Sequence, residues 1–197
     1  MSKTSFINFF YQMESTMKIL KELIIERSFK KTDTPSILLS SGKMSCFYFN
    51  MKKVTYYPAG QVLIGEAVYN KIIELGLSPD AIGGLTMGAD PVAISTSFTS
   101  ALEGNPIESF SIRKEPKEYG MKLQIEGNVQ QGDSVIIIDD VVTTGASTVK
   151  AIRIAREHGL NILAAIVLVD RCEENGRQNI EATGIPMYSI FTVSDFM

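Results

Sequence analysis

Apolar residues recur at helical spacing in two stretches of the first half of the chain. Between Ser15 and Phe29, and again between Gln61 and Gly76, apolar side chains lie three and four residues apart. Side chains at this spacing share one face of a helix, so both stretches are predicted to be amphipathic helices. Segment 1–14 lacks an unbroken apolar core and a small-residue cleavage site, so it is predicted to be a helix packed on the domain rather than a signal peptide.

A short aromatic segment separates these two stretches. Residues Ser45 to Asn50 are rich in Phe and Tyr, and they follow Ser40-Ser41-Gly42, a sequence typical of a turn. The segment is therefore predicted to form a short strand or hairpin with a turn before it.

Strand and helix patterns alternate through the rest of the chain. The predicted order is strand 81–84, helix 91–102, strand 107–113, strand 134–138, helix 147–158 and strand 162–169. The last two strands are continuous apolar runs, which indicates burial on both faces. The pattern predicts an α/β fold in which helices flank a mainly parallel sheet and ligands bind beyond the carboxyl ends of the strands.

Composition narrows the possible functions. With 197 residues and 45% hydrophobic content, the chain can bury one substantial core, so residues 1–197 are predicted to be a single domain. A net charge of -3 gives no overall electrostatic reason to bind nucleic acid or an anionic membrane, and the apolar runs are too short to cross a bilayer. Any anion site should therefore be a local cluster of positive charge.

Cysteine and histidine usage argues against two further classes of protein. Cys46 and Cys172 lie far apart without a partner motif, which favours a reducing cytoplasm over a disulfide framework. The only histidine, His158, precedes Gly159 at a predicted helix end. It is expected there as a last-turn cation rather than as a zinc ligand.

A candidate phosphate site follows the first continuous apolar run. Asp139 and Asp140 come directly after it, and residues 143–148 form a Thr-, Gly- and Ser-rich turn that opens a helix. Backbone N–H groups, hydroxyls and the positive helix end would converge on a phosphate, while the carboxylates could accept hydrogen bonds from ribose hydroxyls. The alternative is an ordinary turn with Ser147 or Thr148 as the helix N-cap, although unpaired buried carboxylates would be costly there.

A second candidate site is the polar segment between strands 107–113 and 134–138. Four of the chain's 19 basic residues fall within ten positions there, among them Arg113, Lys114 and Lys117. The segment is either a solvated charged loop or a mobile loop that closes over a charged substrate. Beside a phosphate site, such a loop could neutralise a departing group and exclude water.

The run Val135–Thr148 resembles the phosphoribosyl pyrophosphate (PRPP) motif of the type I phosphoribosyltransferases, with four apolar residues, two acids and a Thr-Gly-rich loop. Segment 113–127 is similar to the flexible loop of orotate phosphoribosyltransferases in particular, and Gly83–Pro91 resembles the family's pyrophosphate loop. Residues 40–50 look like the N-terminal element that packs against the base. Arg171 follows a strand where the orotate group places an arginine for the base carboxylate.

The resemblance implies a fold and a reaction. The expected fold is the type I phosphoribosyltransferase fold, with N-terminal helices and a small hood in residues 1–60 and a core in residues 61–197 that carries the flexible loop 113–127. The expected reaction transfers phosphoribosyl from PRPP to orotate, giving orotidine monophosphate and pyrophosphate in de novo pyrimidine biosynthesis. Mg2+ would be carried by PRPP without a direct protein ligand, and a homodimer would share the loop across its interface.

The resemblance also implies roles for individual residues. The catalytic residues would be Lys117, Asp139 and Asp140. PRPP would be bound by Arg113, Lys114, Lys117, Tyr119, Asp139, Asp140, Val141, Val142, Thr143, Thr144, Gly145, Ala146 and Ser147. Its diphosphate would also contact Thr86, Gly88 and Ala89 of the pyrophosphate loop, and orotate would contact Phe47, Tyr48, Thr143 and Arg171.

Three positions depart from the pattern of the orotate group. Many members have lysine at Ser40, Tyr-Lys at Met87-Gly88 and histidine at Tyr119. A subset of the family carries a loop like the one here, whereas Tyr119 can donate a hydrogen bond but brings no positive charge to pyrophosphate departure. Two alternatives stay open: a phosphoribosyltransferase for another nucleobase, and a non-catalytic regulator that senses PRPP.

Overall fold

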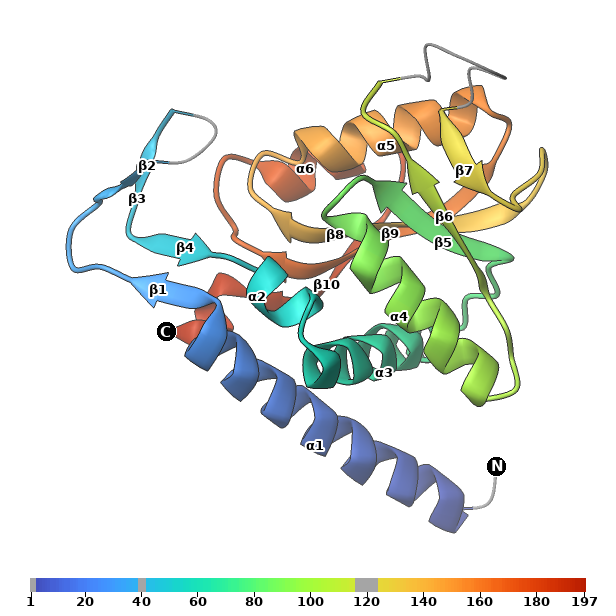
Figure 1. Ribbon diagram of the computed structural model, residues 1–197, viewed down its shortest axis with the longest axis horizontal. Coiled ribbons are helices and arrows are strands. Elements are labelled where there is room, and N and C mark those ends of the chain that lie inside the picture. Colours follow the sequence, from blue (N-terminus) through green and yellow to red (C-terminus); the bar gives the residue numbers. More distant parts are fainter. Residues whose placement is uncertain (1–2, 39–41, 116–123) are drawn as a thin grey trace.

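The computed structural model describes residues 3–38, 42–115 and 124–197. A six-stranded sheet runs through the molecule in the order β10-β9-β8-β5-β6-β7 (Figure 1). Its strands are β5 (Ala81–Leu85), β6 (Glu108–Ile112), β7 (Ile125–Gly127), β8 (Ser134–Val142), β9 (Asn161–Asp170) and β10 (Met187–Thr192). Neighbouring strands are parallel except β6 and β7, which are antiparallel. The predicted mainly parallel sheet is confirmed.

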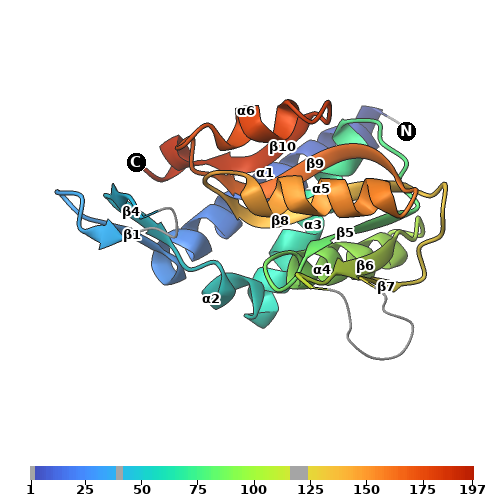
Figure 2. The same ribbon diagram turned by 90° about the horizontal axis from the view of Figure 1, so that it is seen from above.

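Helices cover both faces of this sheet (Figures 1 and 2). One face is covered by α3 (Pro58–Glu74) and α4 (Ala89–Leu102), with α1 (Lys3–Arg27) packed on α3. The other face carries α5 (Ala146–Glu157) and α6 (Gly176–Glu181), and a 3-10 turn, η1 (Val193–Phe196), follows β10. No helix in the described ranges is long and apolar enough to cross a membrane.

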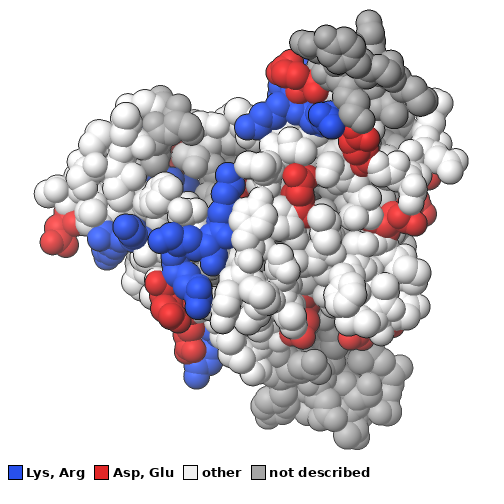
Figure 3. Space-filling model, in the orientation of Figure 1, with Lys and Arg blue, Asp and Glu red and all other residues white. Residues whose placement is uncertain are grey.

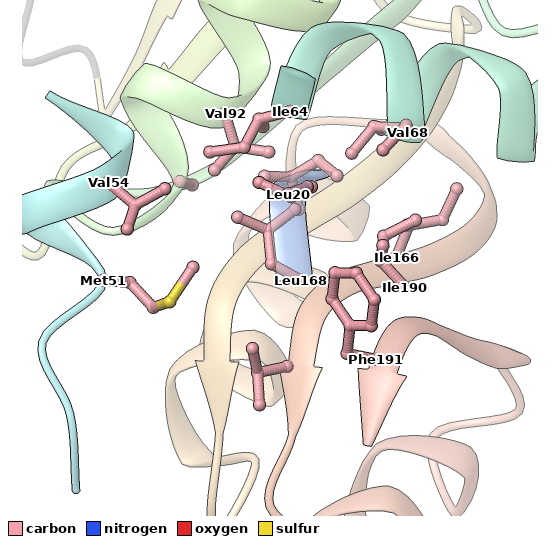
Figure 4. Packing of buried hydrophobic residues seen from close by; sticks show 14 of the residues in the cluster. Leu20, Met51, Val54, Ile64, Val68, Val92, Ile166, Leu168, Ile190 and Phe191 are labelled. Carbon is pink, nitrogen blue, oxygen red and sulfur yellow. The ribbon is translucent and has the colours of Figure 1, made fainter. Parts of the chain in front are cut away.

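Strand β8 contributes to the core on both of its faces, because successive side chains of a strand point in opposite directions. Ile136 and Ile138 join the core under α1, α3 and α4, while Val135 and Ile137 join the core under α5. Figure 4 shows the first of these layers, in which Leu20 of α1 lies at the centre of the group. This two-sided burial fixes β8 and thereby the position of the residues at its carboxyl end.

A small N-terminal hood stands beside the sheet (Figure 1). It consists of two antiparallel pairs, β1 (Phe29–Lys31) with β4 (Phe47–Phe49) and β2 (Ile37–Leu38) with β3 (Met44–Ser45), followed by α2 (Lys52–Thr55). Aromatic packing ties the hood to the core, since the ring centroids of Phe29 and Phe196 lie 5.6 Å apart. The predicted short strand corresponds to β4.

Two predicted boundaries that bear on the site were wrong. Strand β8 continues through both aspartates to Val142 instead of ending at Ile138, because its last two residues pair with Val169 and Asp170 of β9. Residues 125–127, which were assigned to the flexible loop, form β7 and pair with β6. The sequence pattern also did not predict α6 or β10.

Candidate active site

Two aspartates lie near the carboxyl end of β8. Asp139 is buried, with 7% of its surface exposed. One oxygen of its carboxylate accepts a hydrogen bond from the Thr148 hydroxyl at 2.9 Å, and the other accepts one from the Asp140 N–H at 3.0 Å. The Asp140 carboxylate accepts a hydrogen bond from the Val141 N–H at 2.9 Å. These bonds hold both carboxylates at the wall of a hollow beyond the sheet.

Burial governs the protonation of this pair. It raises the pKa of Asp139 to about 7; the negative charge of Asp140 adds to the rise, and the hydrogen bond from Thr148 opposes it. Burial also raises the pKa of Asp140, against the Val141 N–H and the positive charge of Lys52, which lower it. The pair therefore holds a proton more readily than free aspartates do. A ligand that donates hydrogen bonds to it would favour the fully ionised form.

A cradle for an anion follows the aspartates, where β8 leads into α5. Residues 143–147 line a hollow of about 100 Å³ together with Asp139, Val141 and Val142. The hollow combines threonine and serine hydroxyls with the first N–H groups of α5, which have no partner inside the helix. This arrangement, at the positive end of a helix dipole, favours a phosphate group.

Gly145 makes this tight entry into α5 possible. It is the N-cap residue and has φ 74°, a left-handed conformation that glycine adopts readily. A Cβ at this position would lie 2.7 Å from the Gly176 carbonyl oxygen. The expectation that Ser147 or Thr148 would be the N-cap was wrong, since no side chain caps the helix and the Thr148 hydroxyl bonds to Asp139.

A central hollow of about 420 Å³ lies beside the cradle. It is lined by Lys52, Leu85, Thr86, Met87, Gly88, Lys114, Asp139, Asp140, Val141 and Ser147. The backbone after β5 approaches the acids closely, because a Cβ on Gly88 would lie 2.7 Å from a carboxylate oxygen of Asp140. Glycine at this position leaves the acids accessible from the hollow.

An outer hollow of about 520 Å³ is lined by Thr86, Ser111, Arg113, Lys114, Glu115 and Glu126. Glu126 fixes the Arg113 side chain, because Arg113 Nε donates a hydrogen bond to Glu126 Oε1 at 3.0 Å. Lys150 of α5 donates to the Lys114 carbonyl at 2.6 Å. The segment leading out of β6 is thus attached both to β7 and to the helix that carries the cradle.

The three hollows form a continuous series. The cradle and the central hollow share Asp139, Val141 and Ser147, and the central and outer hollows share Thr86 and Lys114. The space-filling view shows two groups of basic side chains on this face, one near the hood and α2 and one near the end of β6, with a hollowed region between them (Figure 3). An elongated ligand with a phosphate at each end would match this series.

A buried arginine lies between the hood and the end of β9. Arg171 is 5% exposed, and its Nη2 donates hydrogen bonds to the Ser45 hydroxyl at 3.0 Å and the Phe47 carbonyl at 2.9 Å. The same nitrogen lies 2.8 Å from Glu173 Oε2. Its Nε is buried and has no hydrogen-bond partner among the residues described. A buried donor without a partner marks a place where a ligand acceptor would be favourable.

Proteins of similar sequence cover most of the chain. The orotate phosphoribosyltransferase of Aquifex aeolicus is 49% identical over 178 residues, which span 90% of this chain and 96% of that protein. The chain belongs to the orotate phosphoribosyltransferase family. The orotate phosphoribosyltransferase of Bradyrhizobium diazoefficiens is 40% identical over 182 residues, or 90% of this chain and 94% of that protein. No family model matches the chain.

The fold agrees with this family. The crystal structure of the orotate phosphoribosyltransferase of Mycobacterium tuberculosis in complex with Fe(III) dicitrate has a TM-score of 0.79 and 29% identity, and covers 92% of this chain and 98% of that one. The type I phosphoribosyltransferase fold, the orotate phosphoribosyltransferase function and the enzyme class, all predicted from the motifs, are confirmed.

Most residues predicted to bind PRPP in this orotate phosphoribosyltransferase fold surround the three hollows. They are Thr86, Gly88, Arg113, Lys114, Asp139, Asp140 and residues 141–147. Ala89 is buried at the start of α4 behind Gly88. Lys117 and Tyr119, like Ser40, lie outside the described residues.

Two of the residues predicted for the base, Phe47 and Tyr48, lie in the hood. The Phe47 ring stacks on Phe29 with centroids 6.2 Å apart, while the Phe47 carbonyl meets Arg171. Tyr48 is exposed, and Thr143 belongs to the cradle.

Sequence reasoning missed several residues at this orotate phosphoribosyltransferase site. Ser45 and Glu173 contact Arg171, Lys150 contacts the segment after β6, and Lys52 lines the central hollow. Ser45 and Glu173 bond to each other across 128 positions of sequence, which no local pattern could show. Lys52 carried one available signal, since it is a basic residue two positions after the aromatic segment 45–50.

Proposed function

We propose that this orotate phosphoribosyltransferase binds PRPP along the three hollows and transfers its phosphoribosyl group to orotate. The observation that carries the proposal is the shared wall of the hollows, which places a phosphate cradle, a pair of carboxylates and a basic outer region in one series. The 5-phosphate would occupy the cradle at residues 143–147. The ribose would lie at the aspartates, and the diphosphate would lie between the 86–89 loop and Lys114.

Asp139 and Asp140 would act on the sugar. Their carboxylates can accept hydrogen bonds from the ribose hydroxyls and stabilise positive charge that develops on the ring. During transfer, the bond between C1 and the leaving oxygen breaks, a ring nitrogen of orotate bonds to C1, and the proton on that nitrogen passes to solvent. The enzyme forms no covalent bond, so its contribution is positioning and electrostatic stabilisation.

Arg171 would bind the carboxylate of orotate. Its buried Nε has no partner among the described residues, and a guanidinium pairs well with a carboxylate. Phe47, Tyr48 and Thr143 would complete the base site. Glu173, which lies beside Arg171, would keep the Arg171 guanidinium in place when no base is bound.

Mg2+ would be carried into the site by the diphosphate. The central hollow offers hard oxygen donors, namely the two aspartates and the hydroxyls of Thr86 and Ser147, and Mg2+ prefers oxygen ligands and keeps several of its waters. When bound, the ion would supply positive charge that neutralises the diphosphate. Lys114, Arg113 and Lys117 would add fixed charge for the leaving group, and Tyr119 a hydrogen bond.

A homodimer would complete the site, with the loop between β6 and β7 reaching the partner. An apolar strip on α4 supports this association, because Ile94, Phe98 and Leu102 are all exposed and lie four residues apart. With Val62 of α3 they border a groove of about 440 Å³. Exposed apolar strips of this kind mark association surfaces.

The first experiment mixes the purified protein with PRPP, Mg2+ and orotate and follows the loss of orotate absorbance. Uracil, adenine and hypoxanthine are tested in parallel, since they lack the carboxylate that Arg171 would bind. We expect turnover of orotate alone. Equal turnover of another base would contradict the base assignment, and PRPP binding without turnover of any base would favour a sensing regulator.

A further inference from the structure

The short helix α2 holds one lysine in the site and its neighbour outside it. Met51, Val54 and Thr55 are buried, so the helix is fixed against the core, while Lys52 and Lys53 are both exposed. Lys52 lines the central hollow, whereas Lys53 is not among its lining residues. The buried residues on either side therefore determine which lysine faces the acids.

Lys52 is electrostatically coupled to the acid pair. The positive charge of Lys52 lowers the pKa of Asp140, against the larger effect of burial. The Lys52 carbonyl accepts the helical hydrogen bond from the Tyr56 N–H, but no side-chain hydrogen bond or ion pair of Lys52 is found within the described ranges, so its ammonium group is available to a ligand. Lys114 is the other basic residue in the described wall of this hollow.

The negative charge in the central hollow makes an available Lys52 ammonium group important for binding a diphosphate. Two carboxylates already lie in the wall, and a diphosphate would bring further negative charge beside them. Positions 40 and 88 are serine and glycine in this chain, so neither brings a positive charge. The described wall of the central hollow thus has two lysines and two aspartates. Lys52 lines the same hollow as Gly88.

We propose that Lys52 binds the diphosphate of PRPP and stabilises its negative charge as it departs. The inference rests on the proposed function and adds a catalytic residue contributed by the hood. An ammonium on a flexible stem can follow the diphosphate from its bound position into the outer hollow, which shares Thr86 and Lys114 with the central one. Lys52 and Lys114 would then hold the leaving group between them.

The test compares Lys52→Gln, Lys53→Gln and Lys52→Arg in the full-length protein. Four quantities are measured: kcat/KM for PRPP, KM for orotate, the inhibition constant of pyrophosphate with Mg2+, and the affinity for ribose 5-phosphate. In Lys52→Gln we expect kcat/KM for PRPP to fall about 30-fold and the inhibition constant of pyrophosphate to rise about tenfold. Orotate KM and ribose 5-phosphate affinity should stay within about twofold, since neither ligand carries the diphosphate that Lys52 would bind.

The control variants separate charge from structure. Lys53→Gln removes the same charge from the same helix and should change each quantity by less than about twofold. Lys52→Arg keeps the charge and should recover most of the pyrophosphate affinity. Unchanged pyrophosphate inhibition in Lys52→Gln, or an equal loss in Lys53→Gln, overturns the role of Lys52 while leaving the proposed function standing. A wild-type protein that fails to turn over orotate overturns both.

Discussion

Two buried charged residues at the site are stabilised in different ways. Arg171 is surrounded by acceptors from Ser45, Phe47 and Glu173. Burial raises the pKa of Asp139 to about 7, the charge of Asp140 adds to the rise, and the hydrogen bonds from the Thr148 hydroxyl and the Asp140 N–H oppose it. The sugar side becomes fully charged when a ligand with hydroxyl donors binds.

This difference predicts how stability depends on pH. The pKa of Asp139 is raised in the folded protein, so between about pH 4 and pH 7 the folded state holds a proton that the unfolded chain has released. The contribution of Asp139 to the free energy of unfolding is therefore largest at low pH and is lost as pH rises through about 7. Asp139→Asn never acquires the buried charge, so we expect it to be more stable than wild type by about 2 kcal/mol at pH 8.

Urea unfolding at about pH 4.5 and about pH 8 measures this difference. At the lower pH the advantage of Asp139→Asn should nearly vanish, because the wild-type carboxyl is then protonated too. Asp33→Asn, at an exposed position in the hood, is the matched control and should show little difference at either pH. An advantage that is equal at both pH values would refute the buried-charge explanation, and orotate turnover should fall sharply in Asp139→Asn at either pH.

At the scale of elements, the turn from β8 into α5 depends on one glycine. Gly145 and Gly104 both have a left-handed φ, of 74° and 75°, but a Cβ would meet the Gly176 carbonyl only at Gly145 and open space at Gly104. We expect Gly104→Ala to cost about 1 kcal/mol and Gly145→Ala about 3 kcal/mol, since the second substitution adds a clash to the backbone strain. Urea unfolding gives both values.

The affinity of the same two variants for ribose 5-phosphate tests whether Gly145 shapes the phosphate cradle. Gly145→Ala should weaken it at least tenfold, because the first turn of α5 must shift away from the cradle. Gly104→Ala should leave it unchanged. Equal loss of stability and affinity in the two variants would show that backbone strain alone, and not the approach of Gly176, makes Gly145 necessary.

The elements that the sequence predicted are those with an unbroken apolar pattern. Strands β8 and β9 and helix α5 were found because burial on one or two faces shows directly in the order of residues. Strand β10 (Met187–Thr192) was missed because it mixes polar residues with apolar ones, and β7 because it has three residues. The aspartates were expected to end β8, but hydrogen bonding to β9 outweighs the change in side-chain polarity.

The parts of the site that one continuous segment supplies could be predicted from the sequence. The acid pair and the cradle are contiguous, so their joint chemistry could be inferred from spacing alone. The surroundings of Arg171 could not, because Ser45 meets it from 126 residues away. Lys52 was missed for the same reason, since only the folded hood brings it to Asp140.

At the scale of the whole molecule, the apolar strip on α4 should join two copies of the chain. Phe98 is 66% exposed and lies at the middle of the strip, so Phe98→Glu would place a charge inside a dimer interface. We expect this variant to sediment as a monomer under conditions where wild type is a dimer. Ile73→Glu is the control, because Ile73 is also exposed but does not line the groove. A monomeric wild type, or a dimeric Phe98→Glu, would place the interface elsewhere or exclude it.

A loop that is shared between the two protomers of the proposed dimer gives a second prediction. Under the proposed function, Lys117→Ala removes a cation that acts on the leaving group and Asp139→Asn alters the acid pair, so each variant alone should be nearly inactive. If the loop of one protomer serves the acids of its partner, a mixed dimer has one site in which both parts are intact. Random exchange makes half of the dimers mixed, with half of their sites intact, so about a quarter of the wild-type activity should return on mixing. A loop that serves its own protomer would leave every site damaged, and mixing would then restore nothing.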